Sequence, residues 1–472
     1  MSVQFVIYGA IVLVASLIAL IVVKPRNAFD LSRCVGWYIL LFATTYVVRP
    51  ALSELVGDYS MYQWLQAGYL EDHWELMAVA GSLAIVCFGI GYASGRPSRR
   101  LAAVAENPAP EPTVNPRLVR RLIVCLLFIG YLSALFVLKY GGGDETLHAR
   151  TATMGTYEHG TAWFSQDDLL ISCATVLYYI ATGRLGISLL LAGPWLGLRV
   201  LSGWGRTNLI GHFFALMSVY FLKRRKRERV AGKTRQALVI GCGVVSVLVL
   251  FPLMGMLRGL RSELGGSAKD AIMMVRSTTD PGDVAQTYFG TNSPVSGFEL
   301  TLSHLVNDKR SELGTQYLYY FFFQPIPRII WPGKGSPYSW PEKLRGIEVD
   351  PLLGIIGAAP GSIGMAFEQW GWLGIPLEFI LTGLIIRRWE EAARRRPKAL
   401  HVQLSYAGLC SLVPQLGRDS LFYMISQFWL FKFGIAVFIL WIMYRSELAR
   451  SGLRTTSARV FPVPPAPAAA KA

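Results

Sequence analysis

The fold is set first by residues 4–26, which read QFVIYGAIVLVASLIALIVVKPR. Residues 4–23 are mostly apolar, and about 20 apolar residues in a helix are enough to cross the hydrocarbon core of a bilayer. No basic residue precedes this run, whereas Lys24 and Arg26 follow it directly. Because Lys and Arg collect on the cytoplasmic flank of a span, the pattern predicts a membrane anchor with its amino terminus outside, rather than a signal peptide.

Similar apolar runs recur along most of the chain. Its 472 residues are 53% hydrophobic and 16% charged, with a mean hydropathy of +0.39. Soluble proteins carry about a quarter charged residues, so we predict an all-α polytopic membrane protein with about 11 transmembrane helices. The predicted spans lie near 4–23, 35–48, 75–93, 118–139, 168–183, 185–201, 207–222, 236–256, 371–386, 401–416 and 421–444.

The formal net charge of +16 is concentrated beside these apolar runs. This distribution follows the positive-inside rule for cytoplasmic loops and argues against a nucleic-acid partner. Eleven spans that begin outside place the carboxyl terminus in the cytoplasm, together with the basic clusters. Those clusters lie at 24–33, 96–121, 223–235, 387–398 and 445–459.

The predicted organisation has four parts. Residues 1–256 form a membrane bundle of eight spans, and 371–446 form a bundle of three more. Between them, residues 257–370 form a large periplasmic loop with ten Lys or Arg and eleven Asp or Glu. We expect this loop to be helical and to carry the functional site, with TQYLYYFFF at 315–323 as a helix on the membrane surface. Residues 447–472 are expected to be a disordered cytoplasmic tail.

Several common site motifs are missing. The sequence has no Asp-x-Asp pair, no His-Glu-x-x-His, no Gly-x-Ser-x-Gly and no complete phosphate-binding loop. The six cysteines lie in or beside apolar runs without metal-ligand spacing, which is typical of small core side chains. We therefore predict no metal site and no cofactor.

Basic residues on the predicted outer face are the main chemical feature. Arginine binds phosphate with two parallel hydrogen bonds and stays charged when partly dehydrated, so a group of arginines at one interface suits a pyrophosphate. Pairing with nearby carboxylates or with lipid headgroups is the alternative for each one. The predicted pyrophosphate-binding residues are Arg206, Arg258, Arg261, Arg328, Lys334 and Arg418.

Two of these cations lie in PIPRIIWPGKGSP at 325–337. Pro325, Pro327, Pro332 and Pro337 fix their own φ angles and restrict their neighbours. The stretch therefore presents its cations with little conformational entropy left to lose, which suits stabilisation of an anionic leaving group.

This stretch resembles the Pro-Arg-x-x-Trp-Pro-x-Lys-Pro signature of bacterial O-antigen and exopolysaccharide repeat-unit polymerases of the Wzy type. Gly335 stands where that family often has proline. GSIGMAFEQWGWLGIPLEFILTG at 361–383 is similar to the family's acidic segment followed by Gly-aromatic-x-Gly, and GWGRTN at 203–208 is similar to its small-residue and arginine hairpin. The hydropathy profile, with a large outer loop before the last spans, also matches.

The resemblance implies a GT-C-like membrane fold and a metal-independent glycosyltransferase. It would join undecaprenyl-pyrophosphate-linked oligosaccharides at the periplasmic face of the bacterial inner membrane, giving O-antigen, capsule or exopolysaccharide. Partners of the family include a chain-length regulator and other polysaccharide export proteins. A general base must be a carboxylate or histidine near the acceptor hydroxyl. Our predicted catalytic residues are Glu368, Glu299 and Arg328, with His304 and Asp419 behind them.

Two alternatives stay open at this point. An O-antigen ligase would use the same donor and the same arginines but deliver the glycan to lipid A–core. A lipid-linked oligosaccharide transporter would instead have short loops, charges buried in mid-span and often internal repeats.

Overall fold

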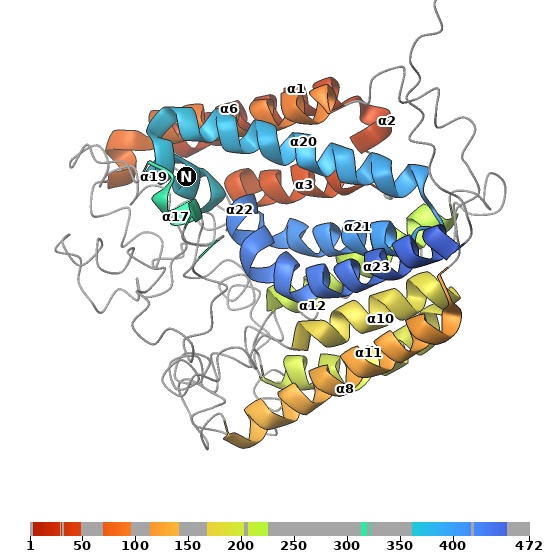
Figure 1. Ribbon diagram of the computed structural model, residues 1–472. Coiled ribbons are helices and arrows are strands. Elements are labelled where there is room, and N and C mark those ends of the chain that lie inside the picture. The colour runs from red at the N-terminus through yellow and green to blue at the C-terminus, as the bar shows by residue number, and fades with distance from the viewer. Residues whose placement is uncertain are drawn as a thin grey trace, which may run out of the picture.

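The computed structural model describes residues 3–28, 30, 33–48, 69–95, 114–140, 168–202, 206–224, 313–318, 322, 361–416 and 420–450. This part of the chain is almost entirely helical and contains no β-strand. Its long helices lie side by side in one bundle (Figure 1). The predicted all-helical fold is therefore confirmed for these residues.

Helices occur at ten of the eleven predicted spans, and the remaining one, 236–256, lies outside the described residues. The long helices are α1 (Val3–Val23), α6 (Tyr69–Ser94), α8 (Pro116–Tyr140), α10 (Asp168–Thr182), α11 (Leu185–Ser202), α12 (Arg206–Arg224), α20 (Gly374–Arg395), α21 (Leu400–Leu412) and α23 (Ile435–Arg450). Shorter helices are α2 (Pro25–Ala28), α3 (Cys34–Ala43), α17 (Thr315–Leu318), α19 (Gly361–Trp370) and α22 (Leu421–Met424). Wider π-helical stretches, Thr44–Val48 and Ile425–Gly434, follow α3 and α22, and 3-10 turns occupy Gly371–Leu373 and Val413–Gln415.

Within the described residues, four helical segments are long and apolar enough to cross a bilayer: Val6–Val23, Trp74–Ser94, Pro116–Leu135 and Gly361–Arg395. Their outward faces carry exposed apolar side chains, such as Val14 on α1 and Phe128 on α8, which are 55% and 66% exposed. A water-soluble protein rarely exposes such continuous apolar stripes. The chain is therefore a helical membrane protein, while the count of eleven spans stays a prediction.

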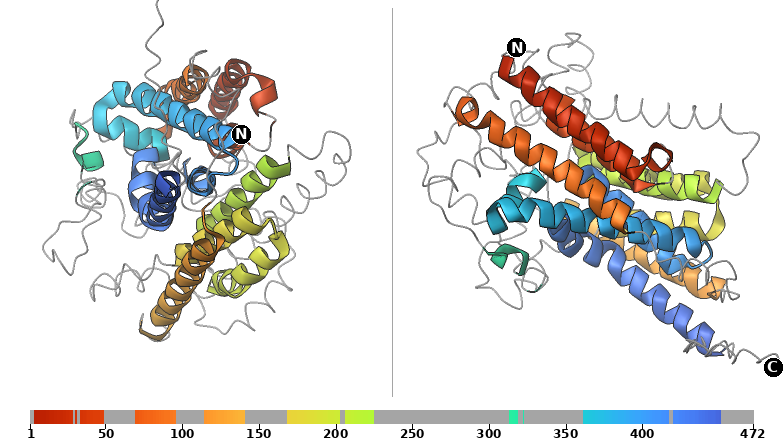
Figure 2. Two further views of the ribbon diagram at one scale, coloured as in Figure 1. Left: turned by 45° about the vertical axis from the view of Figure 1, so that its right-hand side comes forward. Right: turned by 90° about the horizontal axis from the view of Figure 1, so that it is seen from above.

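Successive long helices alternate in direction from α1 to α12, and again from α20 through α21 to α23 (Figures 1 and 2). Helices α1, α6, α10, α12, α20 and α23 begin at the end of the bundle where α17 and α19 lie. Helices α3, α8, α11 and α21 begin at the opposite end, beside α2. We name these the α19 end and the α2 end.

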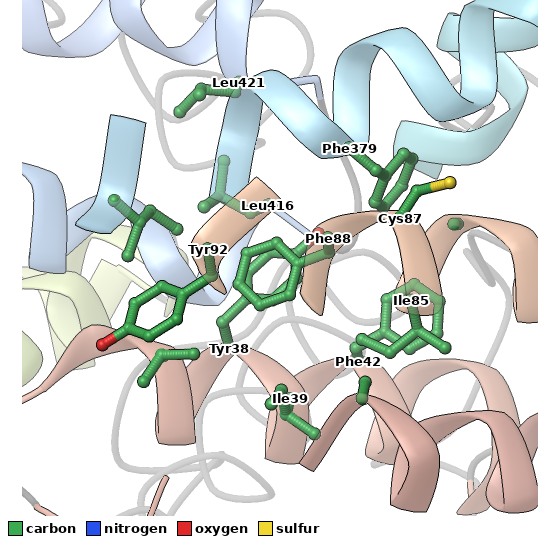
Figure 3. Close-up of a cluster of buried hydrophobic side chains, with 14 of the residues drawn as sticks. Tyr38, Ile39, Phe42, Ile85, Cys87, Phe88, Tyr92, Phe379, Leu416 and Leu421 are labelled. Carbon is green, nitrogen blue, oxygen red and sulfur yellow. The ribbon is translucent and has the colours of Figure 1, made fainter. Parts of the chain in front are cut away.

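The core has two main parts, and α21 contributes to both. In the first part α3, α6 and α20 meet, and Tyr38 of α3 stacks on Phe88 of α6 with ring centroids 4.0 Å apart (Figure 3). Phe42 of α3 meets the edge of Phe379 of α20 at 6.3 Å. The second part joins α8, α10, α12, α21 and α23. The buried faces of α21 therefore hold the two halves of the bundle together.

Helices α6 and α20 touch through glycine. A Cβ atom added at Gly383 of α20 would overlap the backbone carbonyl oxygen of Phe88, and one added at Gly91 of α6 would overlap that of Ile380. Small residues let helix backbones approach closely, which is a common way to pack helices inside a membrane. This contact fixes the position of α20, the helix that carries the polar groups described next.

Candidate functional site

Glu368 lies on α19, the ten-residue helix that leads into α20. Gly371 has a φ of 58° and follows the last residue of α19, a left-handed position that commonly ends a helix. The chain then turns through Gly371–Leu373 and enters α20. This break folds α19 back into the bundle, so Glu368 is only 2% exposed. The predicted loop 257–370 therefore ends in a buried helix.

Tyr317 joins α17 to this helix. Its ring is 8% exposed and packs with Met365 of α19 and Phe422 of α22. The ring of Trp370 meets Tyr317 edge-on, with centroids 6.1 Å apart. Gly314, whose φ is 82°, leads into α17 where a Cβ would lie 2.8 Å from the Trp370 ring, so a larger residue would clash there.

Glu378 of α20 accepts hydrogen bonds on both carboxylate oxygens. The Tyr317 hydroxyl donates to Oε2, and the backbone N–H of Leu421 donates to Oε1 at 3.2 Å. The Ser420 side chain lies within hydrogen-bonding reach of the same pair. Glu378 is 3% exposed, and a buried carboxylate is tolerated where donors surround it.

These contacts bring four elements together at the α19 end: α17, α19, α20 and the start of α22. Burial, together with the Glu378 carboxylate, raises the pKa of Tyr317 well above its usual range, and the charge of Glu368 adds to the effect. Tyr317 therefore stays protonated and remains a hydrogen-bond donor. We call Tyr317, Glu368, Glu378 and Ser420 the outer polar cluster.

The predicted site residues have different outcomes. Glu368 belongs to the outer polar cluster, and Arg206 begins α12 at the same end of the bundle. The other predicted residues lie outside the described residues, and their placement stays a prediction. They are Glu299, Arg258, Arg261, Arg328, Lys334 and Arg418, together with His304 and Asp419.

Sequence analysis missed Glu378 and Tyr317. Glu378 could have been predicted from the sequence, because it is the one acidic residue in the apolar run 371–386. An acidic residue inside a membrane span is energetically costly unless it is paired or has a function. Tyr317 was predicted to lie on the membrane surface, but it is buried between helices. Its neighbour Leu318 is 57% exposed, so only part of this short helix faces outward.

A second polar cluster lies at the α2 end. Arg33 donates to Tyr92 at 2.9 Å and lies 3.4 Å from the carboxylate of Glu390, which is fully buried. Tyr92 also donates to Glu390 at 2.5 Å, and Arg387 donates to Tyr92 at 3.1 Å. We interpreted the basic residues at 387–398 as a cytoplasmic loop, but α20 continues to Arg395 and turns part of this segment into the core.

Burial alone would lower the pKa of Arg33, yet Tyr92 and Glu390 raise it above its ordinary value. Arg33 is therefore a permanent cation held by carboxylates. In this α2 cluster three arginines form ion pairs with three carboxylates: Arg33, Arg387 and Arg394 with Asp30, Glu390 and Glu391. These features suit a structural role.

Among the described residues, no group of three or more His, Cys, Asp and Glu side chains could hold a metal ion. The outer polar cluster instead places two buried carboxylates, Glu368 and Glu378, at the α19 end. Comparison of the chain with protein-family models, with curated proteins and with solved structures finds no match.

Proposed function

We propose that the protein is a polymerase that joins undecaprenyl-pyrophosphate-linked oligosaccharide repeat units into a surface polysaccharide. The reaction would take place at the periplasmic face of the bacterial inner membrane. The observation that carries the proposal is the stretch PIPRIIWPGKGSP at 325–337 and its resemblance to the Wzy-type signature. The stretch begins seven residues after α17 ends at Leu318, and Tyr317 of α17 is packed against the helix that carries Glu368.

The proposed reaction is a substitution at the anomeric carbon of the donor sugar. Glu368 accepts the proton of the acceptor hydroxyl as the new glycosidic bond forms. The bond from the anomeric carbon to the pyrophosphate oxygen breaks, and undecaprenyl pyrophosphate leaves. Arg328 and Lys334, with Arg206, Arg258, Arg261 and Arg418, stabilise the charge that develops on the leaving group.

The buried charges of α20 favour this enzyme over a transporter. Glu378 is the fifth residue of the helix and Glu390 lies five residues before its end at Arg395. A transporter that binds its substrate near the middle of the membrane is expected to bury polar groups there. In α20 both buried carboxylates lie toward the helix ends, each with a tyrosine partner.

The test is reconstitution of the purified protein in liposomes with undecaprenyl-pyrophosphate repeat units as the sole substrate. We expect a ladder of polymer lengths that Arg328→Ala abolishes and that EDTA leaves intact. Arg450→Ala is the matched control, because the Arg450 side chain is 73% exposed on α23. A wild-type ladder with Arg328→Ala would remove Arg328 from the mechanism.

The same assay separates the alternatives. If no ladder forms but glycan is transferred once lipid A–core is added, the protein is a ligase. If neither product forms while lipid-linked substrate crosses the bilayer, it is a transporter.

A further inference from the structure

We propose that Glu378 is a positioning residue, which acts through Tyr317 to hold α17 and α22 around Glu368. This role rests on the proposed polymerase function, in which Glu368 is the general base. Glu378 itself is a poor base candidate, because donors already occupy both of its oxygens. Each of these donors comes from a different segment of the chain.

The first segment is α17. Tyr317 lies 61 residues before Glu378 in the sequence, and its hydroxyl is hydrogen-bonded to that carboxylate. A four-residue helix cannot hold itself in place, because helix nucleation is unfavourable and short helices depend on tertiary contacts. The Tyr317–Glu378 bond and the rings of Trp370 and Phe422 therefore fix α17 on the bundle.

The second segment is the start of α22. The Leu421 N–H is one of the first amides of a helix, which have no partner within the helix itself. Glu378 supplies that partner, and Phe422 then packs on Tyr317 with centroids 5.2 Å apart. One carboxylate thus orders two segments that approach α19 from different parts of the chain.

Tyr317 connects these two segments to the proposed general base, Glu368. Its ring contacts Met365, three residues before Glu368, and Trp370, two residues after it. Glu368 is close enough for its charge to act on the Tyr317 hydroxyl. Loss of the Glu378 contact would therefore loosen the packing on both sides of Glu368 while leaving its carboxylate present.

The α2 end of the same helix provides a matched control. There Tyr92 donates to Glu390 of α20, so Tyr92→Phe and Tyr317→Phe each remove one phenol-to-carboxylate hydrogen bond while keeping the ring. We expect Tyr317→Phe to lower kcat for polymerisation about 10- to 100-fold, because it leaves a buried Glu378 oxygen without its donor and releases α17 from α20. KM should stay within about twofold, since the cations that bind pyrophosphate are unchanged. Tyr92→Phe should keep kcat within about threefold of wild type.

A second readout does not depend on activity. Met365 is 5% exposed beneath Tyr317, so we introduce Met365→Cys into a chain without its native cysteines and measure its rate of maleimide labelling. We expect labelling to rise about tenfold or more in Glu378→Ala, because the contact that holds α17 over α19 is lost. Glu390→Ala should leave the labelling rate at that position unchanged.

The outcomes are distinct. Equal labelling in Glu378→Ala and its parent would overturn the positioning role, whatever the polymer assay shows. Equal losses of kcat in Tyr317→Phe and Tyr92→Phe would also overturn it, because a general effect on α20 would then explain both. Increased labelling in a protein whose wild-type form makes no polymer would reject the proposed function, and with it the positioning of a base, while the contact itself would stand.

Discussion

Two buried glutamates on one helix, Glu378 and Glu390, show how this chain places charge inside an apolar bundle. Each accepts a tyrosine hydroxyl and a backbone N–H, from Leu421 in one case and Val35 in the other. At the α2 end, Arg33 and Arg387 also lie beside the Tyr92–Glu390 pair. The paired charges at the α2 end give a rigid structural contact.

That contact allows a prediction for Arg33→Met. Removing one partner of a buried ion pair leaves the other charge uncompensated, which costs about 3–5 kcal/mol of unfolding free energy. Arg450→Ala provides the comparison, since its pair with Glu447 is exposed and such pairs contribute about 0–1 kcal/mol. Thermal or denaturant unfolding in detergent would measure both. Equal losses in the two variants would show that the α2 cluster is not a stabilising network.

At the scale of helices, close contact between α6 and α20 sets the position of both polar clusters, because α20 carries Glu378 and Glu390. Backbone atoms of α6 already occupy the place of a Cβ at Gly383, so this position tolerates no side chain without separation of the helices. Other glycines lie in open space: a Cβ at Gly197 of α11 would meet nothing within 4 Å.

Alanine substitutions at these two glycines should therefore have opposite effects. Gly383→Ala should lower stability by about 1–3 kcal/mol or more, because the added methyl group overpacks a helix contact. Gly197→Ala should raise it by about 0.5–1 kcal/mol, since alanine loses less backbone entropy in a helix than glycine. Unfolding midpoints in detergent test both. A neutral Gly383→Ala would mean that α6 and α20 are further apart than the structure places them.

Hydrophobic runs predicted the helical class and the positions of ten helices, because burial and lipid exposure both act on local sequence. The two polar clusters were harder to predict from the sequence. Glu378 and Tyr317 are 61 residues apart in the sequence, and Arg33 and Glu390 are 357 residues apart. Neither pairing therefore produces a pattern in the local sequence. Glu368 was predicted from its place at the mouth of a span, whereas the burial of Tyr317 depends on α19 folding back at Gly371.

At the scale of the whole molecule, helix length limits how many helices can cross a bilayer alone. Helix α10 has 15 residues and is about 22 Å long, shorter than a hydrocarbon core of about 30 Å. Helix α6 has 26 residues and reaches further. Short helices such as α10 are held in the bundle by their neighbours α8, α12 and α21.

The orientation of the bundle in the membrane can be tested by labelling a position at each of its two ends. The α2 end carries Lys24 and Arg26, and the basic ends of α12 (Lys223 and Arg224) and α20 (Arg394 and Arg395) also lie there. Positive charge favours the cytoplasmic side. We therefore expect the α19 end to face the periplasm, which the proposed reaction requires. Leu318→Cys on α17 and Ser446→Cys on α23 report on the two ends, because Leu318 is exposed and Ser446 lies near the end of α23.

A membrane-impermeant maleimide applied to spheroplasts should label Leu318→Cys at once and Ser446→Cys only after permeabilisation. The parent chain should lack its native cysteines, because Cys125 of α8 is exposed. The reverse labelling pattern would place the outer polar cluster in the cytoplasm, where polymerisation of translocated repeat units cannot occur. Labelling of both positions without permeabilisation would mean that α17 and the end of α23 share one side, which the alternation of helix directions does not allow.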